Sequence, residues 1–555
     1  MRHRFDTTSG LRRERHGRVG FFTHNMNKPP SHPNPRPNAP APTTSSPSKT
    51  PFADDPARAG ASPTHPTPKP RPRLLPVSQD GIDPADLAAC LRVIEQLDDL
   101  PTEHPDAVAI RRATAGLFKD VKLRRRAQRR AAVLAADAAV TAATATGAEG
   151  RIDDETAGLA LRPSTNGATA GTLVQPRQCY VCKERYVEVD AFYHQLCRDC
   201  AARNHARRDA RTDLRGRRAL LTGGRAKIGM YIALRLLRDG AHTTITTRFP
   251  RDAARRFAAM EDSAQWLDRL QIVGIDLRNP ASVMALADEV AGAGPLDILV
   301  NNAAQTVRRS AASYALLAQA EAAPLPAGPL PAIRTFGPAG ATSGLPAPAD
   351  AALRPHWTPT PHALTALALS AGSASPERIA AGMAIDAGGL VPDLDPVNSW
   401  IQHVEEVDPV ELLEVQLCNQ TAPFILVGRL RTALAASSAR RTYVVNVSAI
   451  EGQFNRGYKG PGHPHTNMAK AAMNMLTRTS AHELLHDGIL MTSVDTGWIT
   501  DERPHPTRMR LAGAGFHAPL DLVDGAARVY DPIVRGEAGE DLHGVFLKDY
   551  EPAPW

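Results

Sequence analysis

The sequence predicts an α/β fold, a doubly wound parallel sheet with helices on both faces, preceded by a small helical segment and a four-cysteine module. Three observations support this prediction. Short apolar or β-branched runs alternate with helical apolar spacing between residues 216 and 555. A glycine-rich turn separates the first of these runs from the first helix. Two Cys-x-x-Cys pairs precede the whole region.

The composition indicates a soluble protein of several domains. With 555 residues the chain is too long for one hydrophobic core, and its 43% hydrophobic and 22% charged residues are typical of globular proteins. A formal net charge of +7 over this length does not by itself indicate nucleic-acid binding. No apolar run reaches the ~18 residues that a membrane helix needs, and the six cysteines do not suit a secreted disulfide scaffold. We therefore expect a cytoplasmic protein without a membrane partner.

The N-terminal third divides into three parts by composition. Residues 1–82 are rich in Pro, Ser, Thr and basic residues without hydrophobic periodicity, which predicts a disordered arm. Residues 83–146 are expected to be a helical segment that opens with an Asp-Pro N-cap. The basic run at 122–130 is more typical of a solvated helix face than of a nucleic-acid patch. The Gly-, Thr- and Ala-rich residues 147–175 are expected to be a linker.

Four cysteines predict a metal site within residues 176–206. Two Cys-x-x-Cys pairs are separated by 14 residues, a spacing that lets four thiolates surround one tetrahedral Zn²⁺. The ligands would be Cys179, Cys182, Cys197 and Cys200. A shell of four sulfurs has no open position for a substrate, so the zinc would be structural. His194 is an alternative ligand, and a redox Cys-x-x-Cys is the alternative chemistry.

Residues 216–555 contain the succession of elements from which a Rossmann sheet is built. Buried strands are expected at 218–222, 243–247, 271–276, 296–300, 442–447, 489–494 and 544–548. After the first of them comes the turn 223–229, which begins and ends with glycine and leads into a helix. Such glycines let the backbone approach a pyrophosphate at the helix N-terminus. The sequence therefore predicts a dinucleotide site at the carboxyl edge of the sheet.

These elements and their motifs resemble the short-chain dehydrogenase/reductase family over residues about 216–555. The resemblance implies a nicotinamide cofactor, a small-molecule carbonyl or alcohol substrate, and a homodimer or homotetramer. Its cofactor motifs fall on Thr222, Gly223, Arg225, Lys227, Ile228, Gly229, Asp276, Leu277, Asn301, Ala303 and Gly497. Lys227 replaces the middle glycine of the turn. Its catalytic motifs fall on Asn419, Ser448 and Lys470, of which Lys470 would also grip the cofactor ribose.

Two departures from the family pattern concern catalysis and length. The family's catalytic tyrosine stands four residues before the lysine, where this chain has Thr466. A threonine hydroxyl lacks the acidity of a phenol, so we expect Tyr458 to be the displaced proton donor, with His463 and His465 as further candidates. Residues 306–397, approximately, are an insertion, which is either unstructured or serves as a lid or partner arm.

Arg248 governs the expected choice of cofactor. It follows the second expected strand, where an acidic residue would bind the ribose hydroxyls of NAD and an arginine accommodates the 2′-phosphate of NADP. We therefore expect NADP(H) rather than NAD, the competing interpretation being an ion pair between Arg248 and Asp252. Together these motifs predict an NADP-dependent oxidoreductase that transfers hydride between the cofactor and a carbonyl or alcohol. The alternative is a catalytically inactive dinucleotide-binding sensor or scaffold, in which the zinc module and the Pro-rich arm bind partners.

Overall fold

The computed structural model describes residues 81–148, 151, 167–336 and 390–555. The chain divides into an N-terminal unit that ends at Thr102 and a larger unit from Glu103 to Trp555. Apart from residues 81 and 82, the Pro-rich arm expected at 1–82 lies outside the described residues. No helix among the described residues is both long enough and apolar enough to cross a membrane.

Helix α1 (Pro84–Glu95) is the main element of the N-terminal unit's described part, and a 3₁₀ turn (Gln96–Asp99) follows it. The Asp83 carboxylate accepts a hydrogen bond from the Ala85 N–H at 2.7 Å. This side-chain cap satisfies a backbone donor that the first turn of a helix leaves unpaired, as the Asp-Pro pair predicts.

A nine-stranded sheet is the centre of the larger unit's described part, in the order β11-β10-β9-β8-β6-β3-β4-β5-β7. All neighbouring strands are parallel except β10 and β11. The bounds are β3 Arg218–Leu221, β4 His242–Thr247, β5 Leu270–Gly274, β6 Ile298–Asn301, β7 Ala332–Thr335, β8 Thr442–Ser448, β9 Ile489–Asp495, β10 Phe546–Lys548 and β11 Glu551–Ala553. The seven expected strands form within two residues of their predicted bounds, and the edge strands β7 and β11 are additions that the sequence did not predict.

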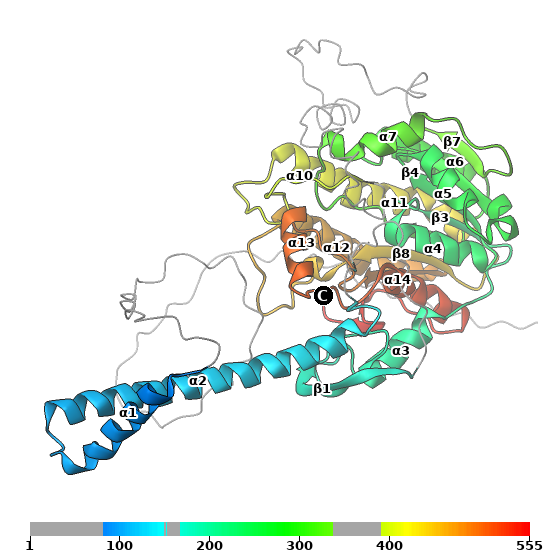
Figure 1. Cartoon of the computed structure of the whole chain (residues 1–555). Helices are drawn as coiled ribbons and strands as arrows, with labels where there is room; N and C mark the ends of the chain where they lie inside the picture. Colours follow the sequence, from blue (N-terminus) through cyan, green and yellow to red (C-terminus); the bar gives the residue numbers. More distant parts are fainter. Residues whose placement is uncertain (1–80, 149–150, 152–166, 337–389) are drawn as a thin grey trace, which may run out of the picture. The chain divides into compact units, whose positions relative to one another are not determined.

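Helices cover both faces of this sheet and confirm the doubly wound α/β class (Figure 1). One face packs against α4 (Lys227–Arg238), α5 (Pro250–Ala258) and α14 (Leu522–Glu537), and the other against α6 (Pro280–Gly292), α11 (Ala422–Ala435) and α12 (Pro464–His486). Along β8, Val445 and Val447 belong to the first core and Val444 to the second. Because strand side chains alternate, Ser448 at the end of β8 lies on the face that α12 covers.

The insertion contributes to the sheet in the part that the structure describes. Helix α7 (Ala315–Ala322) follows a 3₁₀ turn, and β7 then pairs in parallel with β5. The expectation of an unstructured insertion is therefore wrong for this stretch, while residues 337–389 lie outside the described residues. After the insertion, α10 (Pro409–Gln416) continues through a π-helical turn (Leu417–Thr421) into α11.

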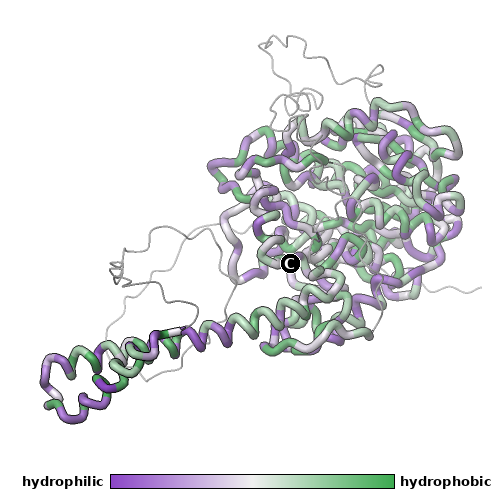
Figure 2. The backbone as a smooth tube through the Cα atoms, in the orientation of Figure 1, coloured by the Kyte–Doolittle hydropathy of each residue, from purple (hydrophilic) through white to green (hydrophobic). Residues whose placement is uncertain are grey.

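The four-cysteine module consists of β1 (Thr169–Gln178), β2 (Arg185–Asp190) and α3 (Arg198–Arg208). Helix α2 (Pro105–Ala142) leads into it with polar and apolar residues mixed along its length (Figure 2). Near its end, the Asp137 carboxylate accepts a hydrogen bond from the Val174 N–H of β1 at 2.6 Å. The structure thus differs from the expected linker at 147–175, because β1 begins at Thr169. Gly171 serves close packing there: a Cβ on it would lie 3.1 Å from a methyl carbon of Val140.

Buried charge and a shared core join this module to the C-terminal part of the sheet domain. Leu196 and Tyr193 of the module belong to one apolar cluster with Leu520 and Leu522. The Tyr193 hydroxyl donates a hydrogen bond to Asp524 at 2.6 Å. Arg208 lies 2.6 Å from Asp521 and 3.0 Å from Asp524, at the buried start of α14. The module is therefore part of the same packed body as the sheet.

We expect Arg208→Met to lower the free energy of unfolding by about 3 to 5 kcal/mol, because it leaves two buried carboxylates without their cation. Arg198→Met is the matched control, since Arg198 stands on the same helix and pairs with Glu188 at the surface. Its loss should cost less than about 1 kcal/mol. Urea titrations of both variants measure the difference. Equal losses of stability would contradict the conclusion that Arg208 neutralises buried carboxylates.

Candidate active site and metal centre

The glycine turn lies at the carboxyl edge of the sheet and is tied to the segment after β6. The Thr222 hydroxyl accepts hydrogen bonds from the backbone N–H groups of Asn302 at 2.9 Å and Ala303 at 3.0 Å. Gly223 has a φ of +70°, and a Cβ on it would lie 2.9 Å from Ala303 Cα. A Cβ on Gly229 would lie 2.0 Å from the Gly223 carbonyl oxygen. Both glycines are therefore required by close backbone packing.

Lys227 stands at a position of the turn whose backbone conformation favours glycine. Its φ of +53° lies in the left-handed region, which costs a side-chain-bearing residue about 1 kcal/mol or more. Lys227 is the first residue of α4, whose N-cap Ala226 supplies no side-chain hydrogen bond. The uncapped N–H groups and the ammonium group beside them suit the pyrophosphate of a dinucleotide. Ile228, the next residue, packs against the apolar cores.

Arg248 follows β4 and keeps an exposed guanidinium group. Its Nη2 donates a hydrogen bond to the Tyr314 hydroxyl at 3.3 Å, and Tyr314 comes from the insertion. Asp252 does not pair with Arg248 in the described contacts. Its carboxylate binds Arg225 at 2.5 Å and Arg256 at 2.8 Å instead. The competing ion-pair interpretation is therefore not supported, and the Arg248 charge faces solvent at this edge.

Asp276 and Leu277 follow β5 in the same edge. Arg278 binds the Asp276 carboxylate through Nε at 3.0 Å and Nη2 at 2.5 Å. Burial alone would raise the pKa of Asp276, but Arg278 outweighs it and lowers that pKa. Leu277 is buried in the second core. The acid therefore stays ionised and fixed in place.

A buried row of polar side chains lies beneath the candidate site. Asn301 Nδ2 donates to Asn446 Oδ1 at 2.8 Å, and Asn446 Nδ2 donates to Thr477 Oγ1 at 2.8 Å. Thr477 Oγ1 in turn lies 2.8 Å from Ser493 Oγ. These bonds join β6, β8, α12 and β9. Asn301 therefore fixes the relative positions of the elements that carry the reactive groups.

Asn419 stands in the π-helical turn and holds the chain after β6. Its side-chain oxygen accepts a hydrogen bond from the Gln305 N–H at 2.7 Å, and its Nδ2 donates to the Gln305 carbonyl at 2.8 Å. The side chain is buried. π-Helical turns inside α-helices often mark functional positions. In this structure Asn419 fixes the position of the backbone at Gln305.

Ser448, Lys470 and Asp495 come together on the α12 face at the ends of β8 and β9. Ser448 pairs in register with Asp495, and its buried Oγ has no hydrogen-bond partner among the described residues. Lys470 Nζ donates to the Val447 carbonyl at 2.8 Å. Burial lowers the pKa of Lys470 to about 8, opposed by the charges of Glu451 and Asp495 among others. Ser448 thus provides a hydrogen-bond donor and Lys470 a cation at the same end of the sheet.

Asp495 is a functional candidate that the motif comparison did not single out. Burial raises the pKa of its carboxyl group to about 6, against a hydrogen bond from the Gly497 N–H that lowers it. Oδ1 accepts that bond at 3.0 Å, and Gly497 itself has a φ of +77°. No local pattern marks Asp495, because only the pairing of β9 with β8 brings it beside Ser448.

The expected proton donors are placed less favourably. The Tyr458 side chain is 75% exposed, and no described contact joins it to Ser448 or Lys470. Thr466 is buried, and its hydroxyl donates only a long hydrogen bond of 3.5 Å to the Thr306 carbonyl. His463 stacks on Trp400 with ring centroids 4.0 Å apart.

His465 is the remaining candidate, and its imidazole is almost fully buried. No side chain among the described residues forms a hydrogen bond with either ring nitrogen. Burial lowers the pKa of His465. A neutral buried imidazole is a poor proton donor near neutral pH.

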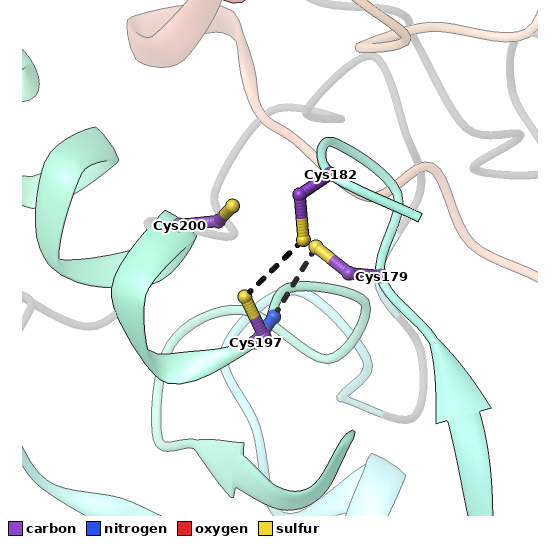
Figure 3. A group of neighbouring side chains, drawn as sticks. All are labelled: Cys179, Cys182, Cys197 and Cys200. Atoms are coloured by element: carbon purple, nitrogen blue, oxygen red, sulfur yellow. Dashed lines mark hydrogen bonds between the residues drawn. The ribbon is translucent and has the colours of Figure 1, made fainter. Parts of the chain in front are cut away.

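The four cysteines converge from both parts of the module (Figure 3). Cys179 and Cys182 bound the turn after β1, while Cys197 and Cys200 lie at the start of α3. Their sulfur atoms all lie within 4.8 Å of one another, and the sulfurs of Cys182 and Cys197 are 3.7 Å apart. A tetrahedral Zn²⁺ with Zn–S bonds of about 2.3 Å requires sulfurs about 3.8 Å apart. The residues therefore fit one zinc ion.

The alternatives for this cluster are less compatible with the geometry. His194 lies outside it, with Nδ1 2.8 Å from the Thr146 hydroxyl, and burial lowers the pKa of His194 to about 3. Burial also raises the pKa of the Cys197 and Cys200 thiols. Burial would also raise the pKa of the Cys179 thiol, but backbone hydrogen bonds outweigh it and lower that pKa. A redox pair needs only two thiols, so the convergence of all four sulfurs is what favours a metal site.

Comparison with known proteins gives a family match to the part of the chain that forms this edge of the sheet. The family model for short chain dehydrogenase matches residues 217–321, which contain the glycine turn, Arg248, Asp276 and Asn301. The uncharacterized protein R665 of Acanthamoeba polyphaga mimivirus is 30% identical over 375 residues, 64% of this chain and 71% of that protein. The chain belongs to the short-chain dehydrogenase family.

Further comparisons give weaker matches. A probable oxidoreductase of Streptomyces lividans is 42% identical over 91 residues, 16% of this chain and 29% of that protein. The NADP active-site complex of Pseudomonas aeruginosa RhlG is 19% identical and covers 60% of this chain and 94% of its own, with a TM-score of 0.37. NADPH-bound carbonyl reductase from chicken fatty liver is 16% identical and covers 63% and 98%, also with a TM-score of 0.37.

We expect natively purified protein to contain one zinc ion per chain, because four sulfurs within 4.8 Å of one another can surround one tetrahedral ion. Cys182→Ser should remove most of that metal. Cys90→Ser, at an exposed cysteine of α1, is the control and should retain it. Elemental analysis measures both, and well under one equivalent in the unmodified protein would refute the zinc site.

Proposed function

We propose that this protein is an NADP(H)-dependent oxidoreductase that transfers hydride between the cofactor and a carbonyl or alcohol. The observation that carries the proposal is the group formed by Ser448, Lys470 and Asp495 at the carboxyl ends of β8 and β9. The glycine turn opens onto the same edge, which is where ligands bind in doubly wound sheets. The oxidoreductase name of the Streptomyces relative supports the reaction class.

The roles of the chain's own groups follow from their surroundings. Bound NADPH would supply the hydride. Ser448 Oγ is free of other described partners, so it can donate a hydrogen bond to the substrate oxygen. Lys470, with a pKa of about 8, is mostly cationic at neutral pH and stabilises negative charge that develops on that oxygen. Asn419 holds the backbone of Gln305 beside them.

We further propose Asp495 as the proton donor in place of the missing phenol. In carbonyl reduction the carbonyl carbon gains a hydride, and the carbonyl oxygen takes the proton of the Asp495 carboxyl group. The products are the alcohol, the oxidised cofactor and the Asp495 carboxylate, which regains a proton from water. A carboxyl group with a pKa of about 6 is near the optimum for acid–base catalysis at neutral pH. The exposed Tyr458 could serve only if its segment moved inward.

The second candidate function is a dinucleotide-binding sensor without turnover. Thr466 favours it, because the buried hydroxyl at the tyrosine position cannot act as an acid. The unpartnered hydroxyl of Ser448 favours the enzyme, because a binding protein needs no hydrogen-bond donor at that place. Screening carbonyl and alcohol panels with NADPH and NADP⁺ separates the two, since a sensor binds cofactor and turns nothing over.

We expect the protein to bind NADPH more tightly than NADH and Arg248→Asp to reduce or reverse that preference. A charge-assisted contact to phosphate is worth roughly 1.5–3 kcal/mol, about ten- to hundredfold in affinity. Arg429→Asp makes the same change of net charge on the exposed side of α11 and should leave the preference intact. Calorimetric titration with both cofactors measures it, and equal affinities in the unmodified protein would disprove the assignment.

We expect kcat/KM for carbonyl reduction to fall as the pH rises above about 6, because the ionised Asp495 has no proton to give. Alcohol oxidation should show the opposite trend, since it needs the carboxylate. Asp495→Asn should lower kcat by orders of magnitude and abolish the break near pH 6, with NADPH affinity nearly unchanged.

Tyr458→Phe is the matched comparison for the proton donor, because it removes a phenol from the same edge without touching the buried group. It should cost little if Asp495 is the donor. A large loss in Tyr458→Phe, together with a nearly silent Asp495→Asn, would instead identify Tyr458.

A further inference from the structure

Residues 496–521, which we call the β9–α14 segment, border the candidate active site. The segment leaves β9 directly after Asp495, the register partner of Ser448. Its Glu502 carbonyl accepts a hydrogen bond from Asn398 Nδ2 at 2.9 Å, and its carboxylate lies 3.4 Å from Arg309. Arg309 lies at the start of the insertion after β6, and Asn398 directly follows the insertion. The segment therefore runs along the carboxyl edge, where a substrate would enter.

The middle of this segment has little packing of its own. Helix α13 (His505–Gly513) has no buried residue. Within the segment, Phe516 packs on Trp498 with ring centroids 5.2 Å apart, and Arg503 lies 5.2 Å from the Phe516 ring centroid. A stretch with few buried contacts has low local stability, so its position depends on what holds its ends.

Both ends are held by the four-cysteine module or by the chain leading into it. At the start, the Trp498 N–H donates a hydrogen bond to the Tyr180 hydroxyl at 2.9 Å, and Ile499 belongs to the module's apolar cluster. At the other end, buried Arg151 donates to the carbonyl of Ala518 at 2.7 Å and to that of Leu520 at 2.5 Å.

Tyr180 connects the β9–α14 segment to the candidate metal site. It lies between Cys179 and Cys182, in the turn whose two sulfurs would bind zinc. The turn closes with a hydrogen bond from the Lys183 N–H to the Cys179 carbonyl at 3.2 Å and with Lys183 at a φ of +66°. Four metal–sulfur bonds would fix this conformation and, with it, the place of the Tyr180 hydroxyl.

We propose that Tyr180 is a positioning residue: the metal-bound module holds the β9–α14 segment over the substrate edge through the Tyr180 hydroxyl and the shared apolar cluster. Its effect on catalysis rests on the proposed oxidoreductase function, whereas its effect on the segment does not. Zinc therefore acts on substrate binding from outside the site. The glycine turn is held independently, by Thr222 and Asn302.

The test compares Tyr180→Phe with Tyr186→Phe in the full-length protein. Tyr186 is the matched control, because it is a phenol of the same module whose hydroxyl donates to the His194 carbonyl at 2.9 Å and not to the segment. Zinc content should be unchanged in both variants. Hydrogen exchange of peptides covering 496–504 should quicken about five- to tenfold in Tyr180→Phe only, the effect of one lost hydrogen bond.

Metal removal provides the second arm of the test. Chelator-treated unmodified protein should show faster exchange over the whole of 496–521, and readdition of Zn²⁺ should restore protection. With an active substrate in hand, Tyr180→Phe should raise KM for that substrate while the affinity for NADPH stays within about twofold of the unmodified protein.

Two outcomes would overturn the proposal. One is unchanged exchange of 496–521 in both Tyr180→Phe and metal-free protein. The other is an equal increase in Tyr186→Phe, which would show general loosening of the module. Hydrogen exchange is measured without turnover. Its result therefore tests the role of Tyr180 even if the protein shows no oxidoreductase activity.

Discussion

The parallel pairing of β3, β6, β8 and β9 is the constraint on which the candidate site depends. Parallel strands end at a common edge, so hydrogen bonds between backbones decide which side chains meet there. The register of β8 with β9 places Ser448 beside Asp495, and that of β6 with β8 places Asn301 beside Asn446. The buried amide and hydroxyl row beneath them fixes this arrangement, because each buried polar group would be costly without its partner.

The second dependence is between the cysteine module and the sheet. A small four-sulfur module is usually pictured as an appendage that folds around its metal. Here its core includes Leu520 and Leu522, and its Arg208 neutralises carboxylates at the buried start of α14. Two carboxylates cannot be buried side by side without a cation, so the module and the C-terminal helix require each other. The four-cysteine module is thus a structural part of the sheet domain.

The departures from the family pattern differ in their physical consequences. Lys227 keeps the left-handed backbone that glycine usually provides, so the turn is preserved at the cost of some strain and gains a positive charge. Thr466 removes a function that no threonine can supply. Asp495 is an acid of suitable pKa on the correct face, and its burial raises that pKa. The proposed proton donor therefore lies on β9, whereas the family's tyrosine position lies on α12.

The sequence by itself determined the features that depend on local pattern. Alternating apolar runs predicted seven strands, the glycine turn predicted its site, and the paired Cys-x-x-Cys spacing predicted the sulfur cluster. Each of these depends on residues close together in the chain, whose periodicity or turn chemistry is visible without the fold.

Only the tertiary structure decided the features that depend on distant partners. The edge strands β7 and β11 form because a neighbouring strand offers its free edge, a partner that is not visible in the local sequence. Arg151 and Thr169 belong to a stretch of linker-like composition, yet Arg151 donates a hydrogen bond to the Ala518 carbonyl and Thr169 pairs with Asp190 in a strand. The bond between Tyr180 and Trp498 spans 318 positions. Contacts of this kind follow from packing, and no local pattern of residues encodes them.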